Sequence, residues 1–222
     1  MTMYFTSDLH IGHRLVAGIR GFWQGDGEPG PDSIPDTDSH SQAIRAAWSV
    51  VKPDDIVWVL GDLCVSQKWW QEALDFLQVL PGRKRLVSGN HDPVSSIHRD
   101  AWKFQKDART VFESIQDFAK IRMNGATALL SHYPYSGTGS EGLDDETGKP
   151  RSVERYTEFR LRDCSLPLIH GHTHGKERLH FSDYGTPQVH VGLDAWGMKL
   201  VPQHEIEKLL DTKISSAMVE AG

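Results

Sequence analysis

The chain has 222 residues, enough for one folded domain with a buried core, and its hydrophobic fraction of 38% is typical of a globular protein. The net charge of −6 argues against a surface dedicated to duplex nucleic acid, although bound metal ions can reverse the sign locally for a small anionic substrate. We expect no membrane span and no secretory leader, and the two cysteines, Cys64 and Cys164, predict reduced thiols in a cytoplasmic protein.

Strand and helix patterns alternate in the first half of the chain. The segments that we expect as strands are the apolar runs 3–7, 56–60 and 86–88. The run at 56–60 is continuous, as in a strand that is buried on both faces. Ser39 with Gln42 resembles a capping box at the start of one helix, and Ser66 can cap a second helix. This alternation predicts a largely parallel sheet.

Hairpin signals dominate the second half of the chain. The elements expected there are a hairpin over 120–132, strands at 166–169 and 188–193, and a helix that starts at Pro202. The hairpin is indicated by an Asn124-Gly125 turn between two apolar stretches. The polar, glycine-rich and acidic stretch 136–150 predicts a mobile insertion. Because the sequence shows no repeat and no separating linker, we expect a single domain over residues 1–222, an α/β fold with an antiparallel portion.

Polar clusters beside glycines follow most of the expected strands. Their members are Asp8, His10, Asp62, Asn90, His91, His132, His170, His172 and His174. In open α/β sheets ligands bind outside the carboxyl ends of the strands, so these clusters can converge on one site. Oxygen and imidazole donors suit Mn²⁺, Fe²⁺ and Zn²⁺. The donors exceed what one tetrahedral ion needs and fit two ions about 3.5–4 Å apart that share a carboxylate.

Each cluster alone has an ordinary interpretation. An Asp-x-His tripeptide such as 8–10 arises often by chance, Asp62 after a glycine is common turn chemistry, and His132 alone is typical of a buried structural histidine. A chance origin would have to place all five clusters at strand ends, so the joint pattern favours a functional site.

The clusters together resemble a known family. Asp8-Leu9-His10, Gly61-Asp62, Gly89-Asn90-His91-Asp92, His132 and Gly171-His172-Thr173-His174 occur in the order of the calcineurin-like metallophosphoesterases. The resemblance implies a four-layer α-β-β-α sandwich of mixed sheets with a binuclear metal site at the carboxyl ends of the strands. It implies one metal held by Asp8, His10 and His174, a second held by Asn90, His132 and His172, and a bridging Asp62.

The resemblance also implies a role for His91, and the residues around it suggest further contacts. His91 is expected to meet the scissile phosphate and assist the leaving oxygen, and Asp92 to orient His91. His13 and Arg14 are candidate substrate contacts. The other histidines are expected to be structural: His170 as a support or core residue, His190 as buried, and His40, His98, His180 and His204 as surface or cap residues.

The function that these features predict is hydrolysis of phosphodiesters, with small substrates such as cyclic nucleotides, by a water that two divalent metal ions activate. Mn²⁺ is the expected ion, with iron, Zn²⁺ or Ni²⁺ as alternatives. A phosphomonoesterase is the nearest alternative function. A nuclease would need a basic track with stacking aromatics. A catalytically silent scaffold that binds a protein partner would tend to have lost ligands, and none is missing here.

Overall fold

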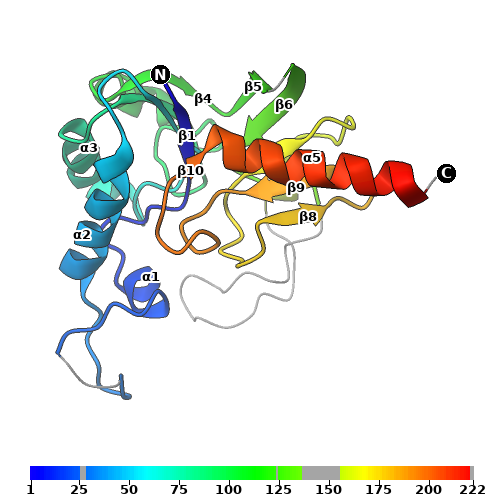
Figure 1. Cartoon of the computed structure of the whole chain (residues 1–222). Helices are drawn as coiled ribbons and strands as arrows, with labels where there is room; N and C mark the ends of the chain where they lie inside the picture. The colour runs from blue at the N-terminus through cyan, green and yellow to red at the C-terminus, as the bar shows by residue number, and fades with distance from the viewer. Residues whose placement is uncertain (26–28, 124, 137–155, 221–222) are drawn as a thin grey trace.

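The computed structural model describes residues 1–25, 29–123, 125–136 and 156–220, with side chains up to residue 211 (Figure 1). Its strands are β1 (Met3–Thr6), β2 (Ile56–Val59), β3 (Arg83–Val87), β4 (Phe112–Gln116), β5 (Phe118–Met123), β6 (Ala126–Ser131), β7 (Leu168–His170), β8 (Leu179–Phe181), β9 (Pro187–His190) and β10 (Val201–Pro202). Its α-helices are α1 (Arg14–Ile19), α2 (Thr37–Ala47), α3 (Trp70–Gln78), α4 (Gln105–Ala108) and α5 (Gln203–Glu220). Short 3₁₀ helices are η1 (Trp48–Val50), η2 (Gln67–Trp69), η3 (Ala101–Phe104) and η4 (Thr157–Phe159).

The strands form two mixed sheets, which confirms the expected α/β fold. The first has the order β10-β1-β2-β3-β4 and is parallel except for β10. The second has the order β5-β6-β7-β9-β8, with β6, β7 and β9 parallel and a hairpin at each side. The carboxyl ends of β1, β2 and β3 therefore meet at one edge of the first sheet.

Two hydrophobic cores explain why the run at 56–60 is continuously apolar. Val57 and Val59 pack with α2 and α3 on one face of the first sheet, where Ile44 and Leu77 are buried. Trp58, one position away, lies in the second core with side chains from the second sheet. Alternate residues of a strand point to opposite faces, so the side chains on both faces of this strand must be apolar.

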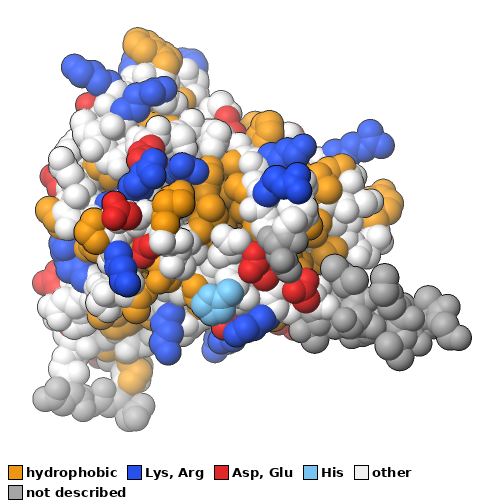
Figure 2. All heavy atoms as spheres, turned by 45° about the horizontal axis from the view of Figure 1, so that its top comes forward, with side chains coloured by type: hydrophobic (Ala, Val, Ile, Leu, Met, Phe, Trp, Pro, Cys, Tyr) orange, Lys and Arg blue, Asp and Glu red, His pale blue; other side chains and the backbone are white. Residues whose placement is uncertain are grey.

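The long helix α5 runs along both sheets, in front of β10 and β9 in Figure 1. It contacts β1 and β10 of the first sheet and β9 of the second, and Ile206 is buried in the core between the sheets. Figure 2 brings forward the end of the molecule where β1 begins; hydrophobic side chains and Lys or Arg dominate there, and histidine contributes little. The histidine-rich site is at the opposite end of the strands.

Several local expectations need correction. The side chain of Asp36, not Ser39, caps α2, because it accepts the N–H groups of Asp38 at 3.1 Å and Ser39 at 2.9 Å. Ser66 precedes η2, which leads into α3, but its side chain makes no capping hydrogen bond. Strands β4, β8 and β10 were not expected. The expected insertion 136–150 lies, apart from Ser136, outside the described residues.

Among the helices that the structure describes, none combines the length and the apolar character that crossing a membrane would require.

Candidate metal centre

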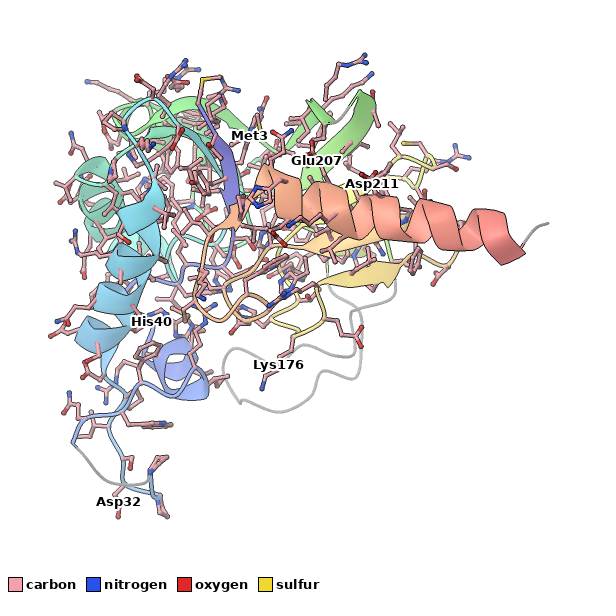
Figure 3. All side chains as sticks on the ribbon, in the orientation of Figure 1. Met3, Asp32, His40, Lys176, Glu207 and Asp211 are labelled. Carbon is pink, nitrogen blue, oxygen red and sulfur yellow. The ribbon has the colours of Figure 1, made fainter. Side chains whose placement is uncertain are left out.

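The candidate ligands come together where strands of the two sheets end. Asp8 follows β1, Asp62 follows β2 and Asn90 follows β3, whereas His132 follows β6 and His172 follows β7 of the second sheet. In Figure 3 the label on Met3 marks the start of β1, at the end remote from these residues. Two donor groups result, which we name the Asp8 cluster (Asp8, His10 and His174) and the His132 cluster (Asp62, Asn90, His132 and His172).

In the Asp8 cluster the Nε2 atoms of His10 and His174 lie close together. Nε2 of His10 lies 3.1 Å from Nε2 of His174, which is 3.9 Å from Oδ1 of Asp8. Neighbouring ligands at about 2.0–2.1 Å from a tetrahedral or octahedral ion lie roughly 2.8–3.4 Å from each other. The two nitrogens have that spacing, so this donor set fits a divalent ion.

The His132 cluster has a similar geometry. Nε2 of His132 lies 3.1 Å from Oδ1 of Asn90 and 3.4 Å from Oδ2 of Asp62. A ligand atom of His172 lies within 4.8 Å of those of Asp62 and His132. The same Oδ2 of Asp62 is 3.8 Å from Nε2 of His10. Asp62 therefore faces both clusters, as a shared ligand must.

Backbone and carboxylate partners set the tautomers of two candidate ligands. Nδ1 of His132 donates to the carbonyl of Leu60 at 2.7 Å, and Nδ1 of His174 donates to Oδ2 of Asp194 at 3.0 Å. In the neutral ring each hydrogen bond leaves the Nε2 lone pair directed into the cluster. Metal-binding histidines are typically oriented in this way.

Charges at the centre are strongly coupled. Burial alone would raise the pKa of the Asp62 carboxyl, but the facing imidazoles of His132 and His91 lower it below its usual value. Burial would lower the pKa of His132, but Asp62 raises it to about 9. In the metal-free chain a carboxylate thus stabilises a protonated imidazole. A divalent ion can replace that proton, because ligation requires a deprotonated imidazole.

The backbone of this site is strained. Five candidate ligands have left-handed φ values: Asp8 at 56°, His10 at 47°, Asp62 at 56°, His172 at 73° and His174 at 52°. Such conformations cost non-glycine residues of order 1–3 kcal/mol each and are concentrated at functional sites. The fold therefore gives up stability to aim these side chains inward.

Close backbone approach requires a glycine beside Asp62. A Cβ at Gly89 would overlap Oδ1 of Asp62 and lie 2.9 Å from Cε1 of His132. Gly89 accordingly lets β3 end against the ligands of the neighbouring strands.

A model of the calcineurin-like phosphoesterase superfamily domain matches residues 34–192. The chain belongs to the calcineurin-like phosphoesterase superfamily. Two curated relatives are both called Gene 66 protein. The one from Mycobacterium phage L5 is 41% identical over 94% of this chain and 93% of its own length. The one from Mycobacterium phage D29 is 39% identical over 94% of this chain and 96% of its own length.

A solved structure extends the comparison. A protein of unknown function from Aquifex aeolicus is 25% identical and covers 94% of this chain and 98% of its own, with a TM-score of 0.59. The superfamily match places the chain among metallophosphoesterase hydrolases and agrees with the two clusters of carboxylate and imidazole donors.

Asp92 contacts the backbone on both sides of the site. Its carboxylate accepts the backbone N–H groups of Asp62 at 3.0 Å, Leu63 at 2.9 Å and Gly89 at 2.8 Å. Nδ1 of His91 donates to the carbonyl of Val65 at 2.9 Å. Asp92 thus ties together the loops after β2 and β3. Burial and the nearby Asp62 raise the pKa of Asp92 to about 6.

The other expected contacts are placed as follows. His13 is buried, and its ring lies edge-on to that of His10 with centroids 5.3 Å apart. Arg14 is exposed at the first residue of α1. His170 stacks on His190 at 5.5 Å, and Nε2 of His190 lies 3.9 Å from Oδ2 of Asp8. His170 and His190 are buried, and they form a layer behind the Asp8 cluster.

The supporting roles of three residues, Arg20, His40 and Asp194, were not predicted from the sequence. Arg20 donates to both carboxylate oxygens of Asp194, at 2.9 and 2.6 Å, and to the backbone carbonyl of Asp8 at 2.8 Å. His40 was expected at the surface, which is wrong: it is fully buried, and its Nε2 lies 3.0 Å from Nη1 of Arg20. Figure 3 shows it on the side of α2 that faces α1. Burial, reinforced by the charge of Arg20, lowers the pKa of His40 to about 3, so the ring is neutral and accepts.

Of these three residues, only Asp194 lies in a sequence pattern that could have indicated its role. It directly follows the run 188–193, and Asp62 likewise comes just after the run 56–60, with Gly61 between them. The roles of Arg20 and His40 depend on contacts between segments far apart in the sequence, and no local pattern marks them.

Proposed function

We propose that the chain is a binuclear phosphodiesterase that acts on small substrates such as cyclic nucleotides. The proposed ligands are Asp8, His10 and His174 for one ion, Asn90, His132 and His172 for the other, and Asp62 for both. The observation that carries the proposal is the position of Oδ2 of Asp62, which lies 3.8 Å from the His10 nitrogen and 3.4 Å from the His132 nitrogen. When bound, two divalent ions, Mn²⁺ in this proposal, polarise water and the phosphoryl oxygens.

The chain's own residues complete the reaction. The P–O bond to the leaving alcohol breaks as a water oxygen bonds to phosphorus. His91 supplies a proton to the departing oxygen, while its Nδ1 remains hydrogen-bonded to the carbonyl of Val65. The ring of His91 lies 5.4 Å from that of His10, which places it beside the clusters and outside the ligand set. His13 and Arg14 remain proposed substrate contacts.

The charge of the site favours diesters over monoesters. A diester carries one negative charge, whereas a monoester carries about 1.5 to 2 near neutral pH. Recognition of a dianion usually employs added arginines. The nearby Arg20 is already committed to Asp194 and to the Asp8 carbonyl. Two ions and one imidazolium suffice for a single charge.

The direct test compares two chromogenic substrates on Mn²⁺-loaded protein. Bis(4-nitrophenyl) phosphate should be hydrolysed with a higher kcat/KM than 4-nitrophenyl phosphate, and Asp62→Ala should abolish both activities. Faster cleavage of the monoester would make the chain a phosphomonoesterase. Activity that survives in Asp62→Ala would contradict the proposed centre.

A further inference from the structure

A cavity of about 570 Å³ opens beside His91. One wall is formed by residues 65–67, after β2, and the other by residues 97–104, which include η3. Asn90 and His91 also line it. Its volume falls within the roughly 300–1,000 Å³ that small-molecule sites occupy.

His91 contacts both this cavity and the metal centre. Its backbone N–H donates to Oδ1 of Asp62 at 2.9 Å, on the side of the metal centre. Its Nδ1 donates to Val65, which belongs to the cavity wall. A phosphate held at the clusters, with its leaving oxygen toward His91, would therefore direct the leaving substituent into the cavity.

The cavity wall formed by residues 97–104 is hydrogen-bonded to the metal centre. Nε2 of His98 donates to the backbone carbonyl of Asn90 at 2.9 Å, which links residues 97–104 to a proposed ligand. His98 is exposed, as expected, and this contact gives it a structural role in addition. A substituent bound against this wall is thus held at a defined distance from the phosphate.

The lining suits a planar and uncharged group. Ile97 and Phe104 supply apolar surface, and Gln67 supplies an amide that can both donate and accept. The two oppositely charged lining residues, Arg99 and Asp100, lie 3.4 Å apart and offset each other. A methyl-sized substituent would leave most of the volume empty.

We propose that this cavity binds the leaving substituent of the diester, and that this substituent is a nucleoside whose base stacks on Phe104. The inference rests on the proposed function and narrows its substrate class. Stacking of a base on an aromatic side chain is worth about 1–3 kcal/mol, or roughly fivefold to 150-fold in affinity.

The test uses two cyclic diesters that have the same six-membered phosphate ring and the same charge. One is 3′,5′-cyclic AMP, and the other is the cyclic phosphate of propane-1,3-diol, which lacks the nucleoside. Phe104→Leu keeps an apolar side chain at the edge of the core but removes the aromatic face. Trp102→Leu is the matched control, because Trp102 belongs to the same η3 helix but is 71% exposed and outside the cavity lining.

We expect the wild type to prefer cyclic AMP in kcat/KM. Phe104→Leu should lower kcat/KM for cyclic AMP about tenfold and leave the propanediol diester unchanged, Phe104→Tyr should restore the preference, and Trp102→Leu should alter neither substrate. Equal losses on both diesters, or none, would overturn the cavity assignment while the phosphodiesterase activity stands. Equilibrium dialysis of adenosine supplies a readout that needs no catalysis. Binding that Phe104→Leu weakens would support the cavity even in a chain that cleaved no diester, an outcome that would overturn the proposed function alone.

Discussion

Nδ1 of His174 lies 3.0 Å from Oδ2 of Asp194, and Arg20 donates hydrogen bonds to both oxygens of that carboxylate. Burial alone would raise the pKa of Asp194, but the hydrogen bonds from Arg20 and His174 lower it, so Asp194 stays ionised. A charged acceptor fixes the ring of His174 in the tautomer that presents Nε2 to the Asp8 cluster. The hydrogen bond between Asp194 and His174 thus connects the loop after residues 188–193 to the Asp8 cluster.

Asp194→Asn should weaken metal binding at the Asp8 cluster. An amide is a weaker acceptor for the His174 ring and for Arg20, and loss of such a supporting partner typically costs about 10–100-fold in metal affinity. At limiting free Mn²⁺, elemental analysis should show occupancy that falls from about two ions per chain toward one. Asp183→Asn, at an exposed position, is the control. Unchanged affinity in Asp194→Asn would show that the ring needs no such partner.

Removal of Asp62 should affect both ions, because its Oδ2 faces His10 and His132 alike. We expect Asp62→Ala to lose most of both equivalents of Mn²⁺, whereas His172→Ala should retain the ion of the Asp8 cluster. Circular dichroism of the two variants controls for folding. If Asp62→Ala kept one tightly bound ion, the residue would serve a single site and the bridging assignment would be wrong.

His91→Ala should separate catalysis from metal binding. Metal content should be unchanged, since His91 is outside both clusters. A proton supplied to the leaving oxygen matters most for poor leaving groups, and general-acid assistance is worth about 10²–10⁴-fold. The loss of kcat should therefore be far larger for diphenyl phosphate than for bis(4-nitrophenyl) phosphate. Equal losses would indicate that His91 only binds the phosphate.

Gly89→Ala should disrupt the centre through sterics alone. The added Cβ would overlap the Asp62 carboxylate and lie 2.7 Å from the Asp62 nitrogen, so the loops after β2 and β3 must separate. Overpacking of this kind typically costs about 1–3 kcal/mol, and metal occupancy should fall with it. Gly30→Ala is the matched control, because a Cβ there has no atom within 4 Å. Urea unfolding and elemental analysis would measure both effects, and wild-type behaviour of Gly89→Ala would contradict the proposed packing.

Local patterns predicted much of the fold. The runs at 56–60 and 120–132 are strands because their apolar pattern and turn residues act over a few positions. Strand β4 was missed because its sequence, Phe-Glu-Ser-Ile-Gln, mixes polar and apolar residues, and pairing with β3 decides its conformation. The cap of α2 was misplaced because Asp36 and Ser39 are both favoured caps within one turn.

In the candidate site, too, local patterns could be predicted from the sequence and long-range contacts could not. Residues such as Asp62 and His132 could be predicted because each lies within three residues of the end of a recognisable strand. The backbone partners of Asp92 could not be predicted, because the N–H groups after β2 are near in space but about thirty positions away in the sequence. Arg20 meets Asp194 across 174 positions, and such pairs are set by the packing of whole elements.

In the proposed centre two ions share Asp62 and act together in the hydrolysis of a phosphodiester. A titration of metal-free protein with Mn²⁺ tests this arrangement when bound metal and hydrolysis of bis(4-nitrophenyl) phosphate are measured in the same samples. We expect saturation close to two equivalents, with full activity reached only as the second ion binds. Full activity at one equivalent, or saturation there, would contradict it.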